Sequence, residues 1–177
     1  MKSKLIILGN STLTGYTQGG GYWSVYLQYL LGLKSLGHKV FLVELLFASG
    51  EQGKDEQRIK SFFRRMKEFE LNENCIIILL PNGQNVQTLD LATAFRIPLN
   101  RVKELIKNAD LFWNLAASIE PPLLNLFRHK VLIDLDPGHL QVSALDWDMG
   151  IADHESHLTV GLKMCNPECN VPTLNLN

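Results

Sequence analysis

The sequence of 177 residues contains only three cysteines and almost no net charge, and long apolar runs are missing. Three cysteines cannot all pair within one chain, and Cys75 lies in an apolar run of the kind that commonly buries a free thiol, so no disulfide framework is indicated. Cys165 and Cys169 have a loose metal-ligand spacing, but no second Cys or His pair at a recognisable zinc spacing accompanies them. We therefore predict neither a metal site nor a cofactor.

The missing apolar runs and the balanced charge exclude two classes of partner. No apolar stretch approaches the ~20 residues of a membrane span, and the first residues are too short an apolar run for a signal peptide, so we predict no membrane span and a cytoplasmic protein. Seventeen Lys and Arg against eighteen Asp and Glu create no basic field for a nucleic-acid backbone, so we predict no nucleic-acid partner. The one basic run, 58–67, is interleaved with apolar residues at helical spacing, which favours a solvated helix face over a binding patch.

What the chain does contain is enough apolar material for a core, because 46% of its residues are hydrophobic and 20% are charged. A chain of this length fits one domain, which we assign to residues 1–165. Residues 166–177 hold two prolines and four asparagines without a helix or strand pattern. We interpret them as an irregular tail or the start of a linker to a missing second domain.

Apolar strand-like runs alternate with amphipathic helical patterns along most of the chain. After Asp136-Pro137-Gly138 the pattern becomes less regular. The alternation predicts an α/β protein, a three-layer Rossmann-like domain with a mostly parallel sheet whose ligands lie beyond the carboxyl ends of the strands. The expected strands are Leu5–Leu8, Val40–Leu46, Cys75–Leu80, Asp110–Leu115, Lys130–Leu135 and Leu158–Gly161, and the expected helices are Tyr22–Lys39, Asp55–Glu70, Leu89–Ala109 divided near Pro98, and a short one beginning near Glu120.

Three consecutive glycines, Gly19, Gly20 and Gly21, stand between the first strand and the first helix. Glycine lets a backbone approach a ligand closely, and the N–H groups of a helix start can face an anion, so these residues are candidates for substrate binding. The alternative is that they only permit a tight turn into the helix, because neither a G-x-G-x-x-G nor a Walker A lysine accompanies them.

Polar residues at the expected ends of later strands are the other candidates. The stretch that contains Asp134, Asp136 and His139 closes a buried strand, where carboxylates and an imidazole can bind a hydroxylated acceptor, act as a general base or share a divalent cation. We assign Asp136 and His139 as catalytic and Asp134 as substrate-binding, with an ordinary Asp-Pro-Gly turn as the alternative. Ser118 is a candidate helix cap and a candidate ligand contact. The polar stretch 153–157 is interpreted as a surface loop, with a metal or acid–base site as the alternative.

The first strand, helix and second strand resemble the N-terminal domain of GT-B glycosyltransferases. Many members of that family carry a Gly-Gly after the first strand, a helix with leucines on one face, and a Gly-His-x-Val leading into the second strand. Here Gly20-Gly21 and Gly37-His38-Lys39-Val40 keep that order and approximate spacing, within the stretch Leu5–Leu46. Thr17-Gln18 stands where some relatives carry a lysine just before the glycines.

The resemblance implies the acceptor-side domain of a glycosyltransferase, in which a second Rossmann-like domain binds most of a nucleotide-sugar donor and the sugar passes to a hydroxyl of a small molecule or glycan. It implies that Gly20 and Gly21 lie near the donor phosphates or the acceptor. The chain would then be a fragment or one half of a split enzyme, with little activity alone. The alternative is a non-catalytic Rossmann-like or flavodoxin-like module that binds a small ligand or a partner protein. The sequence leaves the oligomeric state open.

Overall fold

The computed structural model describes residues 2–83, 86–162, 166 and 168, and in this part of the chain seven strands form one sheet. Their order across the sheet is β4-β3-β2-β1-β5-β6-β7, and every neighbouring pair is parallel except β3 and β4. The predicted α/β class, with a mostly parallel Rossmann-like sheet, is confirmed. The strands are β1 Leu5–Asn10, β2 Lys39–Phe47, β3 Cys75–Leu80, β4 Thr93–Phe95, β5 Leu111–Leu115, β6 Lys130–Asp134 and β7 Ser156–Thr159.

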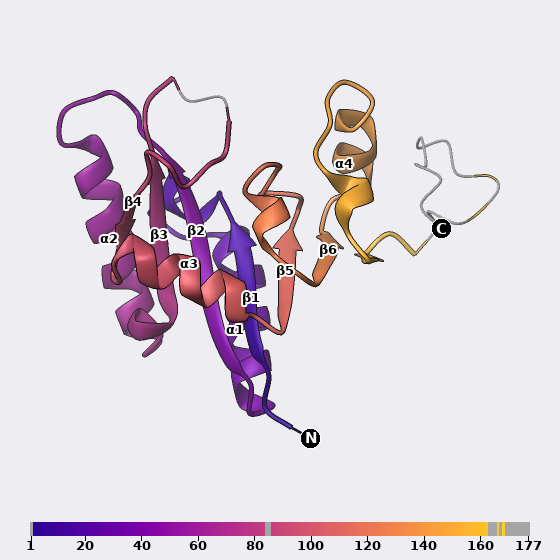
Figure 1. Cartoon of the computed structure of the whole chain (residues 1–177), viewed down its shortest axis with the longest axis horizontal. Helices are drawn as coiled ribbons and strands as arrows, with labels where there is room; N and C mark the ends of the chain where they lie inside the picture. The colour runs from indigo at the N-terminus through magenta and orange to yellow at the C-terminus, as the bar shows by residue number, and fades with distance from the viewer. Residues whose placement is uncertain (1, 84–85, 163–165, 167, 169–177) are drawn as a thin grey trace.

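Helices cover both faces of this sheet, so the fold has three layers, with the sheet in the middle. α1 (Gly21–Ser35) and α2 (Lys54–Glu68) pack on one face. α3 (Leu99–Asn108) packs on the other face, in front of the strands in Figure 1, and α4 (Pro137–Ser143) packs beside β6. Short 3-10 helices lie between these elements: η1 Leu13–Gly15, η2 Asn72–Asn74, η3 Leu124–Leu126 and η4 Ile151–Asp153.

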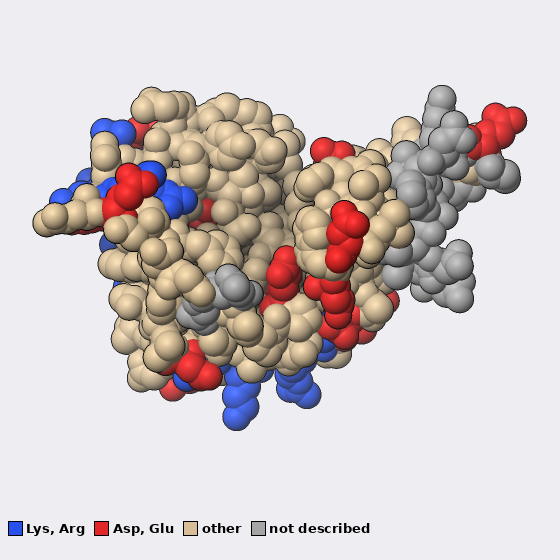
Figure 2. Space-filling view, turned by 90° about the horizontal axis from the view of Figure 1, so that it is seen from above, with Lys and Arg blue, Asp and Glu red and all other residues tan. Residues whose placement is uncertain are grey.

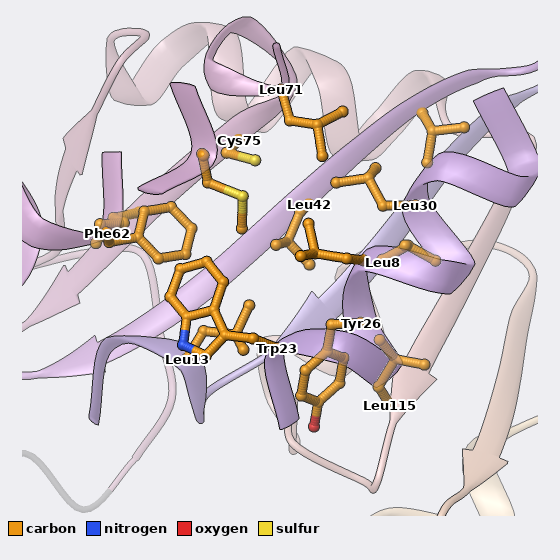
Figure 3. Close-up of a cluster of buried hydrophobic side chains, with 14 of the residues drawn as sticks. Leu8, Leu13, Trp23, Tyr26, Leu30, Leu42, Phe62, Leu71, Cys75 and Leu115 are labelled. Atoms are coloured by element: carbon orange, nitrogen blue, oxygen red, sulfur yellow. The ribbon is translucent and has the colours of Figure 1, made fainter. Parts of the chain in front are cut away.

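The central strands are apolar on both faces because both faces are covered. In β1, Ile6 and Leu8 contact the layer of α1 and α2, whereas Ile7 contacts the layer of α3. Figure 3 shows the first of these cores, where Trp23 of α1 lies beside Leu13 and Phe62, and the ring centroids of Trp23 and Phe62 are 5.8 Å apart. Two separate apolar layers, one on each side, therefore hold the sheet.

Cys75 begins β3 as a buried free thiol, in agreement with the sequence prediction. Burial raises its pKa, so it is an unreactive part of the core. Cys165 and Cys169 lie outside the described residues, as does most of the predicted tail 166–177.

Two helix predictions need correction. Residues 93–95 form the antiparallel edge strand β4 rather than part of a helix, because Thr93 and Phe95 suit a strand and their backbone pairs the otherwise open edge of β3. Pro98 then precedes α3, so the predicted division at this proline is correct. The short helix expected to begin near Glu120 is instead the 3-10 helix η3, which begins three residues after Pro121.

The segment after β6 is more regular than the sequence analysis indicated, because it contains α4. Asp136 is the N-cap of this helix and Pro137 is its first residue, both favourable choices at a helix start. Within the described residues, no helix is both long and apolar enough to cross a lipid bilayer.

Candidate functional site

A cavity of about 890 Å³ opens beyond the carboxyl ends of β1 and β5. The parallel strands follow the Rossmann order, in which the chain leaves neighbouring strands β1 and β5 toward opposite sides of the sheet, and ligands bind in the crevice between the diverging loops. Figure 2 looks down onto this end of the molecule and shows the hollow near its middle. We call this cavity the crevice; the residues on its wall that matter below are Tyr22, Tyr29, Ser118, Glu120, Asp136 and His139.

One wall of the crevice is built by the loop after β1 and by one face of α1. Tyr22, Tyr26 and Tyr29 are spaced by four and three residues, which places their rings on the same side of the helix, and Ser11 and Thr12 add hydroxyl groups. Burial raises the pKa of Tyr26 to about 12, against the opposing effect of a side-chain hydrogen bond with Thr12. This wall is therefore aromatic and hydroxyl-rich, and it is uncharged.

The opposite wall of the crevice is formed by the residues directly after β5, which begin with two alanines in left-handed backbone conformation. Ala116 and Ala117 have φ of 53° and 51°, a region that costs non-glycine residues about 1–2 kcal/mol each. Ser118 comes next and lines the crevice, but its Oγ donates to the carbonyl of Leu115 at 2.6 Å. The prediction of Ser118 as a helix cap is wrong, because no helix begins there; its hydroxyl bonds back to the strand end instead.

Gln87 holds this wall in place, a role that the sequence analysis missed. Its side-chain oxygen accepts from the backbone N–H of Glu120 at 2.7 Å, and its side-chain nitrogen donates to the carbonyl of Ser118 at 3.3 Å. Gln87 is itself 6% exposed and lines the crevice. A glutamine distant in sequence thus positions Ser118 and Glu120, and no local motif marks such a contact.

The third wall of the crevice is formed by the residues directly after β6. Of the two aspartates that the sequence analysis grouped, only Asp136 lies on this wall. Asp134 lies beneath the surface, where its carboxylate accepts from Thr159 Oγ1 at 2.9 Å and from the backbone N–H of Asp136 at 3.2 Å. Burial raises the pKa of Asp134 despite these bonds. Asp136 and His139 line the crevice, and Oδ1 of Asp136 accepts from the backbone N–H of His139 at 3.3 Å.

The Gly-rich turn forms the rim between the first strand and α1. Gly19 and Gly20 have φ of 97° and 109°, and Gly20 is the N-cap of α1 without a capping side chain. Gly21 lines the crevice, whereas Gly19 packs against the guanidinium of Arg65, which also lies 5.1 Å from the ring centroid of Trp23. A basic group, Arg65 of α2, therefore lies beside this turn. The loop just before the glycines contains no basic residue at the position where some relatives carry a lysine.

A buried carboxylate anchors the loop that carries Ser11 and Thr12. Glu44 of β2 is fully buried; one of its oxygens accepts from the backbone N–H and the hydroxyl of Thr14, at 2.7 and 2.9 Å, and the other accepts from Asn10 Nδ2 at 2.5 Å. Burial raises its pKa to about 7, although these hydrogen bonds and the nearby Arg58 oppose the rise. Glu44 thus fixes the loop from below without lining the crevice.

The polar stretch 153–157 is not simply a surface loop, which corrects that interpretation for one residue. His154 is 5% exposed; its Nε2 lies 3.1 Å from Asn114 Nδ2 and its Nδ1 lies 3.1 Å from the carbonyl of Ile151. The Asn114 amide also exchanges two hydrogen bonds with the backbone of Ile119, which assigns Nε2 of the imidazole as the acceptor. Burial lowers the pKa of His154, in keeping with a neutral structural imidazole.

Charge distinguishes the crevice from the rest of the surface. Among the described residues, its wall carries Glu120 and Asp136 and contains no Lys or Arg. Burial and the nearby Asp148 raise the pKa of Glu120. In Figure 2, red acidic atoms lie beside the hollow, while blue basic atoms gather at the periphery. A separate cavity on the other side of the loop after β1 is lined by four basic residues of α2: Lys54, Arg58, Lys60 and Arg64.

The strand order and the crevice define a Rossmann-like α/β fold. No family model, curated protein or solved structure matches the chain. Among the described residues, no three His, Cys, Asp or Glu side chains come together as a metal ion requires. Of the predicted site residues, Gly21, Ser118, Asp136 and His139 meet in the crevice, whereas Gly19, Gly20 and Asp134 lie outside its wall.

Proposed function

We propose that this chain is the acceptor-side domain of a glycosyltransferase-like protein, and that the crevice holds a hydroxylated acceptor. One observation carries the proposal: in the described part of the chain, the crevice at the divergence of β1 and β5 is lined by hydroxyls, amides, two carboxylates and an imidazole, without Lys or Arg. Such a wall can exchange hydrogen bonds with the hydroxyls of a sugar and offers no cation to a phosphate.

In this proposal, Asp136 and His139 act on the reacting hydroxyl. One oxygen of Asp136 caps α4, while Oδ2 makes no hydrogen bond within the described part of the chain and is available to an acceptor hydroxyl. A neutral imidazole can take the hydroxyl proton as the oxygen attacks the donor sugar, the usual task of a general base. The bond between the anomeric carbon and the diphosphate then breaks, and the nucleoside diphosphate leaves with that electron pair. Ser118 and Gly21 would then contact the substrate from the other walls.

The donor belongs at the rim rather than inside the crevice. Arg65 beside Gly19 and the uncapped start of α1 favour a diphosphate there, while a second domain would supply the remaining contacts. A single domain gives little rate, because orientation and water exclusion require the closed cleft.

Amide NMR titration of the chain tests this function. We expect glucose to shift the amides of Ser118, Asp136, Gly138 and His139 saturably, and Asp136→Asn to weaken that response. Glu104→Gln, which removes an exposed carboxylate of α3 paired with Arg101, is the matched control and should leave the response unchanged. Uridine, guanosine and adenosine diphosphates should instead shift amides at 19–23.

If no sugar shifts the crevice amides, the acceptor proposal is wrong. If the diphosphates bind and sugars do not, the crevice is a nucleotide site. A non-catalytic ligand-binding module remains the second candidate, favoured by the same crevice; it predicts sugar binding without any sugar transfer when nucleotide-sugar donors and a second domain are supplied.

A further inference from the structure

The carboxylates in and around the crevice have no cationic partner among the residues that the structure describes. Glu120 lies on one wall and Asp136 on another, Asp148 lies near Glu120, and Asp134 lies below Asp136. Within the described chain, none of the four forms an ion pair, whereas seven other carboxylates do so. Two carboxylates on the crevice wall, with Asp134 and Asp148 close to them and no counter-charge among the described residues, repel one another and attract a cation.

The crevice offers this cation more than carboxylates. The rings of Tyr22 and Tyr29 of α1 are at least partly exposed on the facing wall, whereas Tyr26 is buried in the core, and the face of an aromatic ring attracts an ammonium group within about 6 Å. The hydroxyl and amide groups of Ser11, Thr12 and Gln28 suit the hydroxyls of the same ligand. The cavity therefore combines acidic, aromatic and hydrogen-bonding surfaces in one volume.

A divalent metal ion fits this arrangement less well than an organic cation. A metal ion needs several ligating side chains converging on one point, and the described residues contain no such group of three. Glu120 and Asp136 instead belong to different walls of a cavity of about 890 Å³, which has room for a small organic molecule.

We propose that the ligand of the crevice is a hydroxylated molecule that carries a protonated amine, of the amino-sugar class. This inference rests on the proposed function, because it names the class of acceptor that the same crevice selects. The ammonium lies between Glu120 and the tyrosine wall, and the hydroxyls lie toward Ser118 and Asp136. Bound this way, the cation relieves the repulsion between Glu120 and Asp148.

The test compares glucosamine, glucose and N-acetylglucosamine, which share a ring and differ in the charge at one carbon. Calorimetric or NMR titration of the chain near pH 6.5 should give glucosamine an affinity about tenfold above that of glucose, the size of one close charge pair. N-acetylglucosamine should not share the gain, because acetylation removes the charge. The preference should shrink as ionic strength rises.

Variants locate the charge recognition. Glu120→Gln should remove most of the glucosamine preference, measured as the ratio of the glucosamine and glucose affinities, while Glu104→Gln, on α3, should leave this ratio unchanged. If Glu120→Gln does not fold, as circular dichroism would report, Asp148→Asn gives a second reading and should reduce the preference by a few-fold.

Each outcome decides between the two proposals. Equal binding of glucose and glucosamine to the unmodified chain overturns the amine inference and leaves the acceptor proposal standing. A preference that survives both Glu120→Gln and Asp148→Asn also overturns it. Failure of all three sugars to bind removes the acceptor proposal together with this inference.

Discussion

Glu44 is a charged side chain inside an otherwise apolar layer. It faces Asn10 of β1, Thr14 of η1, Tyr26 of α1 and Arg58 of α2, and it also affects the thiol of Cys75 in β3. Isolated burial of a carboxylate is costly, so the hydrogen bonds from Asn10 and Thr14 make its presence tolerable. The result is an acid whose pKa of about 7 lies well above its ordinary value of 4.5.

This raised pKa predicts a defined dependence of stability on pH. Between pH 4.5 and about 7 the folded chain holds the Glu44 proton more tightly than the unfolded chain, so stability is present below this window and is lost as pH rises through it. We expect the free energy of unfolding of the natural chain to fall by about 2–3 kcal/mol relative to that of Glu44→Gln over this range.

Urea unfolding of both proteins at pH 5, 6, 7 and 8 measures the difference, and the comparison cancels the effects of other titrating groups. A difference that stays constant from pH 5 to 8 would show that Glu44 titrates normally.

At the residue scale, sequence reasoning found the candidates that follow a strand and missed those that act from a distance. Asp136 and His139 were predicted because they stand directly after an apolar run. Gln87 and Arg65 were not, because their contacts with Ser118 and Gly19 join segments tens of residues apart. Only the folded chain brings such pairs together.

At the level of elements, α4 is the helix whose start bears directly on the site. Its N-cap, Asp136, also lines the crevice, so a loss of binding in a variant of this residue has two readings. The two readings are loss of the helix cap and loss of the carboxylate that contacts the ligand. Replacing Asp136 by Asn removes the charge but keeps a capping side chain, so it distinguishes them.

Asp136→Ala should destabilise the chain by about 1 kcal/mol, because the backbone N–H of His139 loses its acceptor, whereas Asp136→Asn should stay within a few tenths of the natural chain because Asn also caps. Chemical unfolding midpoints measure both. If the two variants lose the same stability, the carboxylate charge matters more than the cap.

Element prediction succeeded where apolar runs were continuous and failed where neighbours decided the structure. The run Cys75–Leu80 was predicted as the strand observed. Residues 93–95 form a strand because their backbone pairs with the edge of β3. The local sequence pattern does not reveal this pairing. For α4 the signals were present, Asp before Pro at a helix start, but the same residues also suit a turn.

For the whole molecule, the order of the strands predicts where the fold is most resistant to opening. β1 is paired on both sides, by β2 and β5, and is covered by apolar layers on both faces. β7 lies at the edge of the sheet, and most of its side chains are exposed.

Amide hydrogen exchange should therefore be slowest in β1, β2 and β5 and fastest among the strands in β7 and β4, with differences of orders of magnitude. Mass spectrometry of peptides from a labelled chain measures this order. Protection of β7 equal to that of β1 would mean that something beyond the sheet covers that edge.

The two left-handed alanines after β5 set a limit on how this binding surface can diversify. A bulky or β-branched side chain at position 116 or 117 would meet a backbone penalty, and Ala117 is also buried, so small residues are favoured there. New ligand preferences in variants of this chain would then arise at other crevice positions such as Ser118, Glu120 and Tyr22, while positions 116 and 117 keep small side chains.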